Sequence, residues 1–466
     1  MNEKYKVLLI HPHKIGKKGV MDNLRYPPLG IATLASVLRN EGMEAFIYDA
    51  NIEEGDTFKR ISELIRQEGI RAIGLSFTSI LAKGAYYFAD RLKQEFPNLP
   101  IIAGGYHPTV MADEVAKHPS IDYVVAGEGE ITFPALLKTV WEGGDPKGVK
   151  GVCFRYCDET IHTDVRPLIS NIDNVPIPAY DLLGLNSYSS LSSTRKPFVT
   201  VVRSRGCPFR CLFCGVDAIF SHRYRCQSPE RTLAEVLFLV KQYRVREILF
   251  KDSDFLINRR NAEEFCSMLL KERLDLVWSC NARVDKVDRN ILGLMKQAGC
   301  NQITFGIESG SQKMLDALKK DSTVEQAVEA VRLTKEQGMA CVGNFIIGAP
   351  GEDHETVTKT IELIKVLNLD YASFHYLTAF PGSALYKQAI QNNWFIDDPQ
   401  SFGYEEININ ASKLSNAELK RVMRLAIGAF YFRPSYILNR LMRITPAEVR
   451  NNFVGGLGLL YKMLGR

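Results

Sequence analysis

The chain has 466 residues, 46% of them hydrophobic and 24% charged, so it can bury a core and is not a mainly disordered protein. Its 58 basic and 53 acidic residues give a net charge of +5. No secretory signal opens the sequence and no uncharged apolar run reaches the roughly 18 residues of a membrane-spanning helix, so we expect a cytoplasmic protein. The ten cysteines are irregularly spaced, which favours reduced thiols and metal ligation over disulfides.

Residues 1–140 alternate short apolar runs with helix-length amphipathic segments. The apolar runs are KVLLIHP, EAFIYDA, RAIGLSFTS, LPIIAGGYHPT and IDYVVAGEGE. This alternation is typical of a parallel sheet with helices on both faces. We therefore expect a doubly wound (Rossmann-like) α/β domain, which binds ligands at the carboxyl ends of its strands.

Residues 141–196 break this alternation with glycine, proline and serine, so we expect a linker with a small hairpin there. A second alternation fills residues 197–390 and predicts strands at 198–204, 246–252, 276–283, 302–308, 341–348 and 371–380. Six strand and helix pairs are too few for a closed eight-stranded barrel, so we expect a partial (β/α)6 barrel of the TIM type. Residues 391–466 are expected to form a helical, basic C-terminal region.

Three cysteines follow the first expected barrel strand, in the sequence RGCPFRCLFCG. Cys207, Cys211 and Cys214 lie on one short loop, and thiolates this close can converge on one metal centre, either an iron–sulfur cluster or zinc. A structural zinc site needs a fourth Cys or His at a familiar spacing, and the near candidates His222 and Cys226 complete no recognised pattern. Because three ligands leave one iron of a cluster open, we favour a catalytic cluster.

The spacing of the three cysteines, with Phe213 before the last of them, resembles the signature of the radical S-adenosylmethionine (SAM) superfamily. The resemblance implies a 4Fe–4S cluster whose open iron binds the amino and carboxylate groups of SAM. One-electron reduction then breaks a carbon–sulfur bond and gives the 5'-deoxyadenosyl radical. The resemblance also implies an electron donor of the flavodoxin or ferredoxin type.

Two further expected strand ends carry groups that the superfamily uses for SAM. Asp252, Ser253 and Asp254 follow the second strand, where relatives bind the methionine ammonium. Glu308 and Ser309 follow the fourth strand, where relatives bind the ribose hydroxyls. For Asp252, Ser253 and Asp254 the alternative is a helix cap.

The third and fifth strand ends add two more candidates. Arg283 follows the third strand and is expected to bind the cofactor carboxylate, with a salt bridge at the barrel mouth as the alternative. Gly348 follows the fifth strand, where a glycine lets the backbone approach the adenine closely. The alternative for Gly348 is a tight turn.

Four strings in residues 1–140 resemble the cobalamin-binding domain of one large subfamily of these enzymes: RYPPLGIATLASVLRNEG, GLSFTS, AGGYHPT and GEGEITF. The resemblance implies cobalamin at the strand ends, where Gly104 and Gly105 leave room and Ser76 and Ser79 can form hydrogen bonds. A simple nucleotide can use the same features.

One loop departs from the better-known cobalamin domains. These carry Asp-x-His-x-x-Gly, whose His binds cobalt, whereas residues 49–52 here read Asp-Ala-Asn-Ile. A bound cobalamin is then expected to have no lower ligand from this loop, which favours methyl transfer to a carbon radical. His11, His13 and His107 stay open as ligands, although a His near a strand end is more often only hydrogen-bonded.

The end of the chain is strongly basic, with nine Lys and Arg but a single acid, Glu448, from Lys420 to Arg466. Aromatic and aliphatic residues alternate with these charges, a pattern that suits an anionic membrane or a lipid-like substrate. The alternative, which we favour, is a helical lid that packs on the barrel and leaves a basic face in solvent. No known nucleic-acid-binding module is present, so we expect no nucleic acid partner.

The sequence as a whole favours a cobalamin-dependent radical SAM enzyme that transfers a methyl group to an unactivated carbon of a small-molecule or lipid-like substrate. The alternative within the family is a radical cyclase or rearrangement enzyme, which yields no methylated product. From a different class, the alternative is a binding protein that uses the cluster as a redox sensor. A methylthiotransferase is disfavoured because no cysteine precedes Cys153 to hold a second cluster.

Overall fold

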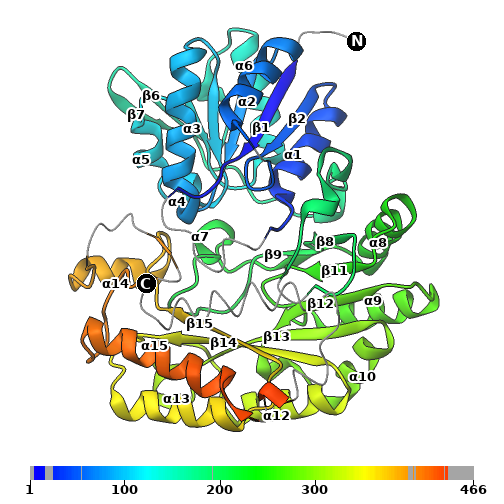
Figure 1. The fold of residues 1–466 in the computed structure, drawn as a ribbon. Helices are drawn as coiled ribbons and strands as arrows, with labels where there is room; N and C mark the ends of the chain where they lie inside the picture. Colours follow the sequence, from blue (N-terminus) through cyan, green and yellow to red (C-terminus); the bar gives the residue numbers. More distant parts are fainter. Residues whose placement is uncertain are drawn as a thin grey trace. The chain divides into compact units, whose positions relative to one another are not determined.

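The computed structural model describes residues 5–15, 25–53, 55–190, 193–396, 402–403, 406–434 and 436–438. The described chain divides into two compact units (Figure 1). The first contains residues 5–15, 25–188 and 218–221, and the second contains residues 189–217 and those from 222 onward.

The first unit is built on a mixed sheet with the strand order β2-β1-β3-β4-β5-β6-β7. The first five strands of the chain are parallel, and β6 and β7 are antiparallel at one edge. Because β2 and β3 flank β1, the carboxyl ends of β1 and β3 form the switch point where such sheets bind ligands. The strands are β1 (Lys6–His11), β2 (Glu44–Asp49), β3 (Ala72–Ser76), β4 (Ile101–Gly104), β5 (Tyr123–Val125), β6 (Val152–Tyr156) and β7 (Glu159–His162).

Helices cover both faces of this sheet, which confirms the doubly wound α/β fold. Buried side chains of α1 (Leu29–Asn40) and α6 (Gly129–Trp141) pack on one face. Those of α2 (Thr57–Glu68), α3 (Ala82–Glu95) and α5 (Ala112–Lys117) pack on the other. The short α4 (Tyr106–Val110) directly follows β4 and places its backbone at the ligand-binding edge.

The first unit extends beyond the expected boundary at residue 140. The expected hairpin is present as β6 and β7, but β6 pairs with β5 and so belongs to the first sheet. Covering the edge of β5 removes an unpaired strand that other chains could join. Tyr188 is also fully buried in this unit. The segment expected as a linker is therefore largely part of the first unit.

The second unit is an open sheet of six parallel strands in chain order, which confirms the partial barrel. Each expected strand is present, although the C-terminal ends of several are shorter than expected. The strands are β8 (Phe198–Val201), β11 (Glu247–Phe250), β12 (Val277–Ala282), β13 (Cys300–Glu308), β14 (Ala340–Ile347) and β15 (Tyr371–Tyr376). The short strands β9 (Ser204–Arg205) and β10 (Arg225–Cys226) pair with each other beside this sheet.

Most of the longer helices of this unit begin at a capping side chain that accepts a hydrogen bond from the first turn, such as Ser228, Asp288 or Asp353. Among the described residues, no helix combines the length and the apolar character needed to cross a membrane. The helices of this unit are α8 (Pro229–Tyr243), α9 (Arg259–Lys271), α10 (Arg289–Gln297), α11 (Gln312–Ala317), α12 (Val324–Glu336), α13 (His354–Val366), α14 (Ala384–Gln391) and α15 (Asn416–Tyr431). The short α7 (Asp217–Phe220) falls mostly in residues 218–221, which belong to the first unit.

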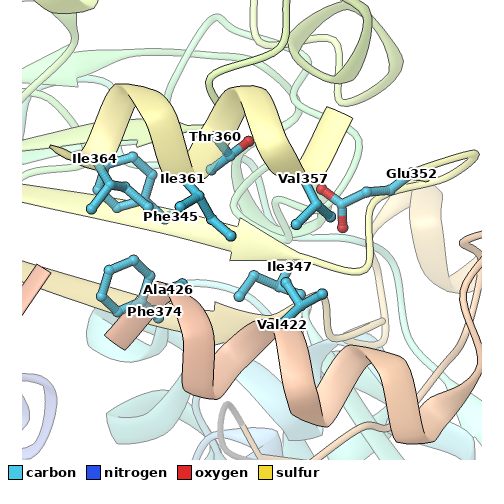
Figure 2. A pocket seen from close by; sticks show the side chains of 10 residues that line it. All are labelled: Phe345, Ile347, Glu352, Val357, Thr360, Ile361, Ile364, Phe374, Val422 and Ala426. Carbon is cyan, nitrogen blue, oxygen red and sulfur yellow. The ribbon is translucent and has the colours of Figure 1, made fainter. Parts of the chain in front are cut away.

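Helix α15, the described part of the expected helical tail, packs on α13 and on β14 and β15. Its buried residues include Leu419, Val422 and Ala426. Figure 2 shows a small apolar pocket between α13, α15 and these strands, with the carboxylate of Glu352 at one end. The pocket thus lies on the helix-covered side of the sheet, where it is part of the packing between α13 and α15.

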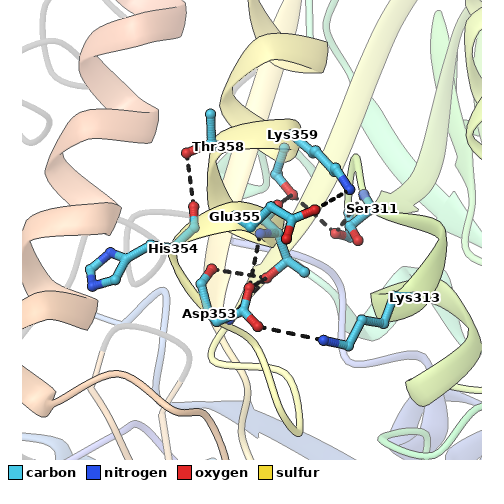
Figure 3. A network of polar contacts seen from close by, with 10 residues as sticks. Ser311, Lys313, Asp353, His354, Glu355, Thr358 and Lys359 are labelled. Carbon is cyan, nitrogen blue, oxygen red and sulfur yellow. Dashed lines mark hydrogen bonds and ion pairs between the residues drawn. The ribbon is translucent and has the colours of Figure 1, made fainter.

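Polar side chains at the N-terminal turn of α13 form a network of hydrogen bonds and ion pairs (Figure 3). The Asp353 carboxylate accepts a hydrogen bond from the Thr356 backbone N–H and lies 3.4 Å from Lys313 Nζ. One turn further, Lys359 Nζ lies 2.7 Å from Glu355 Oε1. The charges at this end of α13 are therefore paired locally, as is common for exposed helix faces.

The buried Glu352 makes a pH-dependent contribution to stability that can be measured. Its Oε2 accepts a hydrogen bond from the Gly348 N–H at 2.6 Å, and burial raises the pKa of its carboxyl to about 7. Since this pKa lies above the ordinary value of 4.5, the contribution is fully present below pH 4.5 and is lost as the pH rises towards 7. We expect Glu352→Gln to gain about 2 kcal/mol of stability relative to the wild type between pH 5 and pH 8.

Urea unfolding at the two pH values measures this difference. Glu355→Gln is the control, because Glu355 is exposed in the first turn of α13, three residues after Glu352, and Lys359 lowers the pKa of its carboxyl. Equal pH trends for the wild type and Glu352→Gln would contradict the assignment.

Candidate cofactor sites

The three cysteines of the RGCPFRCLFCG sequence lie on the loop that leads away from β8 and β9. The backbone of Leu212 fixes the loop on both sides, because its N–H donates to the Leu318 carbonyl and its own carbonyl accepts from the Leu385 N–H, both at 2.9 Å. The Leu212 side chain is buried. A buried anchor in the middle of the loop holds Cys211 and Cys214 on either side of it.

The three thiols are partly buried and close enough to affect one another. Burial, with smaller contributions from the neighbouring Cys214 and Cys211, raises the pKa of Cys207 to about 11. Burial also raises the pKa of Cys211 and of Cys214, although the cation of Lys320 opposes the increase at both. The free thiols are therefore protonated at neutral pH, and binding a metal centre must release protons.

The donor set fits an iron–sulfur cluster, because three soft sulfur ligands on one loop suit such a cluster and leave one iron open. Within the part of the chain that the structure describes, no group of three or more His, Cys, Asp or Glu side chains is placed to hold a metal ion. The assignment of a cluster therefore rests on the cysteine motif and on the resemblance that the motif carries.

Asp252, expected at the SAM ammonium, lies in a fully buried network with Arg203. Ser204 Oγ donates a hydrogen bond to Asp252, and Arg203 Nε lies 3.7 Å from Asp252 Oδ2. Arg203 stacks 3.8 Å above the Phe255 ring and donates to Asn261 Oδ1 at 2.5 Å. Asp252 thus balances a buried cation and joins the loop after β8 to the loop after β11.

Asp252 and Asp254 each have one buried carboxylate oxygen, Oδ2, without a hydrogen bond. They differ because Asp252 Oδ2 lies 3.7 Å from Arg203 Nε, whereas Asp254 makes no salt bridge within the described residues. Oδ1 accepts the Leu256 N–H at 2.8 Å, whereas Oδ2 is buried and makes no hydrogen bond within the described residues. Burial raises the pKa of Asp254 to about 6, and the carboxylate in turn raises the pKa of Cys207. A buried acceptor beside the cysteine loop fits a cationic ligand group. Ser253, between the two aspartates, is exposed.

Glu308 ends β13 in a left-handed conformation with φ of +65°. Its Oε1 accepts a hydrogen bond from Lys320 Nζ at 2.7 Å, and both side chains are largely buried. A β carbon on Gly306 would lie only 2.4 Å from Glu308 Oε1 and 2.6 Å from Lys320 Nζ, so this pair needs a glycine beside it. The ion pair is thus built into the carboxyl edge of the sheet.

Ser309 and Arg283 are both held by protein groups. Ser309 Oγ lies 3.0 Å from Thr360 Oγ1 on α13, so its hydroxyl is turned to the helix. The Arg283 guanidinium stacks 3.8 Å above the Phe209 ring of the cysteine loop and donates to Asp285 Oδ1 at 2.7 Å. Arg283 therefore lies beside the cysteine loop, as a ligand of the cofactor carboxylate must.

Gly348 follows β14 with φ of +94°, and a β carbon there would meet nothing closer than 3.8 Å. The backbone conformation, rather than crowding, is the reason for glycine at this position. Its N–H is held by Glu352.

At the carboxyl edge of the first sheet, Gly105 and Gly104 have different requirements. A β carbon on Gly105 would lie 3.0 Å from both Phe77 O and Ser76 Oγ, and its φ is +96°, so the fold itself needs this glycine. A β carbon on Gly104 would meet nothing closer than 3.8 Å. Packing therefore does not require a glycine at Gly104, which leaves the approach of a ligand at the end of β4 as a reason for it.

Ser79 and His107 bind each other rather than facing open space. Ser79 Oγ lies 3.0 Å from His107 Nδ1, and both side chains are buried. Burial lowers the pKa of His107 to about 4, so this imidazole is neutral at pH 7. Ser76 is the last residue of β3 and is half-buried, so it lies at the switch point between β1 and β3.

Better-known cobalamin domains carry their His in the loop after β2. In this chain, hydrogen bonds to the Asp49 carboxylate hold that loop. Asp49 Oδ1 accepts the N–H and the side-chain amide of Asn51 at 3.0 and 3.1 Å, and Oδ2 accepts the Tyr188 hydroxyl at 3.0 Å. His11 is directly opposite Asp49 in the pairing of β1 and β2. Burial lowers the pKa of His11 even though Asp49 opposes the shift.

Four residues of these sites were not expected from the sequence: Arg203, Gly306, Lys320 and Tyr188. Each of them contacts a residue that is distant in the sequence or that only the packing of the fold brings near. A signal existed for Lys320, since the run LKKDST follows the expected ribose contact by about a dozen residues and a lysine there can return to the strand end. Arg203 offered a signal as well, because it is a charged residue one position before the expected end of a mainly apolar strand.

Comparison with known proteins agrees with this geometry. A family model described as Radical SAM superfamily matches residues 201–364, and one described as B12 binding domain matches residues 22–137. The chain is 33% identical over 438 residues to the uncharacterized methyltransferase PH0819 of Pyrococcus horikoshii, with 94% of each chain covered. It therefore belongs to the family of radical SAM enzymes with an N-terminal cobalamin-binding domain, which use a 4Fe–4S cluster, SAM and cobalamin.

Two other proteins are similar to this chain. It is 29% identical to an anaerobic magnesium-protoporphyrin IX monomethyl ester cyclase of Rubrivivax gelatinosus, with 86% of this chain and 72% of that protein covered. The solved structure of the cobalamin-dependent SAM radical enzyme OxsB with aqua-cobalamin and SAM bound covers 98% of this chain and 71% of its own, with a TM-score of 0.74 and 19% identity. The latter confirms the fold.

Proposed function

We propose that the protein is a cobalamin-dependent radical SAM methyltransferase that places a methyl group on an unactivated carbon of a small-molecule or lipid-like substrate. The observation that carries this proposal is the similarity along nearly the whole chain, through both family domains, to a relative that is named a methyltransferase. When bound, the cluster supplies the electron that cleaves SAM, and cobalamin supplies the methyl group.

The loop after β2 supports methyl transfer. Residues 49–52 offer no imidazole, and the Asp49 carboxylate is saturated by Asn51 and Tyr188. Burial and Asp49 both raise the pKa of the Tyr188 hydroxyl, so the phenol stays protonated and is not an anionic ligand. The loop would therefore give a bound cobalamin no ligand to its cobalt, which favours methyl transfer.

We assign the residues as follows. Cys207, Cys211 and Cys214 hold the cluster. Asp254 receives the methionine ammonium of SAM, Arg283 its carboxylate and Glu308 the ribose hydroxyls, while the backbone at Gly348 approaches the adenine. In the first unit, Gly104 and Ser76 face cobalamin and Gly105 shapes the turn.

Three expected contacts take supporting roles in this assignment. Asp252 orients the loop of Asp254 through Arg203 and Ser204. Ser309 fixes the turn after Glu308 through Thr360, and Ser79 fixes His107. The hydroxyls of Ser309 and Ser79 already have hydrogen-bond partners, and Asp252 faces the buried Arg203 cation, so we assign all three to holding the site together rather than to touching the cofactors.

Separate replacement of Asp254 and Asp252 distinguishes a residue that binds SAM from one that stabilises the fold around the site. We expect Asp254→Asn to weaken SAM binding about tenfold or more, because it removes a charge-assisted contact to the ammonium. We expect Asp252→Asn to act mainly on stability, because it leaves the buried Arg203 without a counter-charge. Equilibrium dialysis of SAM on the reconstituted holoenzyme and urea unfolding measure the two effects. Unchanged SAM affinity in Asp254→Asn would remove Asp254 from the site.

Labelled SAM tests the reaction itself. The holoenzyme is incubated anaerobically with reduced flavodoxin, SAM carrying a deuterated methyl group, and extract from cells that lack the gene. Methyl transfer consumes one SAM as methyl donor and one as radical source, so S-adenosylhomocysteine and 5'-deoxyadenosine form in equal amounts and a product gains the labelled methyl group. Formation of 5'-deoxyadenosine alone would contradict methyl transfer.

A cyclase is the second candidate, because the similarity to the Rubrivivax cyclase also spans both domains. It would consume one SAM per turnover and give no labelled product. The same experiment therefore decides between the two candidates. For either enzyme we propose a cytoplasmic location and an electron donor of the flavodoxin or ferredoxin type.

A further inference from the structure

Helix α15 presents an outer face that carries basic charge without counter-charges. Lys420, Arg421, Arg424 and Leu425 are exposed on successive turns, while Leu419, Val422 and Ala426 face the sheet. Within the described residues, Lys420, Arg421 and Arg424 make no salt bridge. The only acid between residues 416 and 438 is Glu418, which caps the helix and pairs with His354.

Exposed faces of three other helices in this unit carry charges that are paired along the helix. Arg260 pairs with Glu264 on α9, Arg332 with Glu329 and Glu336 on α12, and Lys359 with Glu355 on α13 (Figure 3). These pairs follow the spacing of three or four residues that brings side chains together on a helix. The outer face of α15 lacks such partners, so its charge is directed into solvent.

Exposed apolar side chains lie on α15 and in the residues that directly follow it. Leu425, Phe432 and Leu438 are 51%, 48% and 60% exposed, and Ile437 is also exposed. Arg433 holds this end in place, because its Nη1 donates to the carbonyls of Ile364 and Lys365 at the last turn of α13, at 3.0 and 2.7 Å. We call the set Lys420, Arg421, Arg424, Leu425, Phe432, Ile437 and Leu438 the α15 surface.

We propose that the α15 surface docks on an anionic lipid membrane. Basic side chains beside exposed aliphatic and aromatic side chains match the boundary between anionic headgroups and acyl chains. Charge argues against two other occupants: the rest of this chain after residue 438 carries five basic residues and one acid, and a second copy would present the same basic face. An acidic partner is required, and the apolar side chains favour a lipid surface.

Sedimentation of the full-length holoenzyme with lipid vesicles tests this proposal. One set of vesicles is phosphatidylcholine alone, and the other has roughly one phosphatidylglycerol in three lipids. We expect binding to the anionic vesicles only. Binding should weaken when the salt rises from about 0.1 M, where charges act over about 10 Å, to about 1 M, where they act over about 3 Å.

The triple variant K420E/R421E/R424E locates the binding surface. Each basic residue at an anionic membrane contributes about fivefold to the partition constant, so we expect a loss of about a hundredfold. The matched control K117E/K241E/K271E changes three exposed lysines that make no salt bridge within the described residues, and changes the net charge equally. It should bind like the wild type. Both variants should release 5'-deoxyadenosine at the wild-type rate, because none of the six residues belongs to the cofactor sites.

Four results would overturn the proposal. These are equal binding to both kinds of vesicle, no binding to either, an equal loss in the two triple variants, or wild-type binding of K420E/R421E/R424E together with a loss in R440E/R443E/R450E. Binding of duplex DNA in place of vesicles would also overturn it, since a phosphate backbone offers no partner for the apolar side chains. None of these results depends on the substrate or on the reaction that we propose.

Discussion

Replacing any one of Cys207, Cys211 or Cys214 by alanine is expected to remove the cluster and reduce the release of 5'-deoxyadenosine to background. The loop supplies three sulfur ligands, so the loss of one leaves too few to hold four irons while keeping one open for SAM. Iron and sulfide analysis of the anaerobically purified variants measures the cluster, and chromatography of the reaction measures the nucleoside.

Cys157→Ser is the control for these variants, because Cys157 is exposed on the hairpin of the first unit. It should keep both the cluster and activity. A Cys211→Ala protein with a full complement of iron that still cleaves SAM would show that the ligands lie elsewhere.

Lys320→Met is expected to destabilise the protein by about 3 kcal/mol or more, because it leaves the buried Glu308 carboxylate without its cation. Burial lowers the pKa of Lys320, but Glu308 and Cys211 outweigh it and the pKa is raised, so the ammonium is charged when the site forms. The variant should also bind SAM more weakly, since Glu308 loses the group that fixes its position.

A double-mutant cycle with Glu308→Gln measures the coupling between the two residues. The double variant should regain part of the lost stability, because it removes the unpaired charge as well. Lys319→Met is the control, since Lys319 is exposed next to Lys320. Equal unfolding midpoints for Lys319→Met and Lys320→Met would show that the ion pair between Lys320 and Glu308 does not stabilise the fold.

The strands of both units were predictable because they are apolar runs of limited length that alternate with amphipathic helices. The cysteine loop was predictable because its three ligands are local in sequence. The carboxyl edge of a parallel sheet brings strand ends together, so Asp254, Arg283 and Glu308 could be placed in one region without knowledge of their contacts.

The direction of individual side chains could not be predicted in the same way. Ser79 and Ser309 occupy the expected positions, but their hydroxyls bind His107 and Thr360, which only the packing of α4 and α13 brings near. Likewise, the pairing of β6 with β5 depends on an exposed edge, and no local pattern reveals which sheet a hairpin will join. The contact between Tyr188 and Asp49 spans 139 residues, beyond the reach of any sequence motif.

Mössbauer spectroscopy of the anaerobically purified holoenzyme, with and without SAM, tests the central claim most directly. Three protein ligands predict a 4Fe–4S cluster in which one iron differs from the others and changes its spectrum when SAM binds. A cluster whose irons are all insensitive to SAM, or a protein that contains zinc in place of iron, would contradict the account.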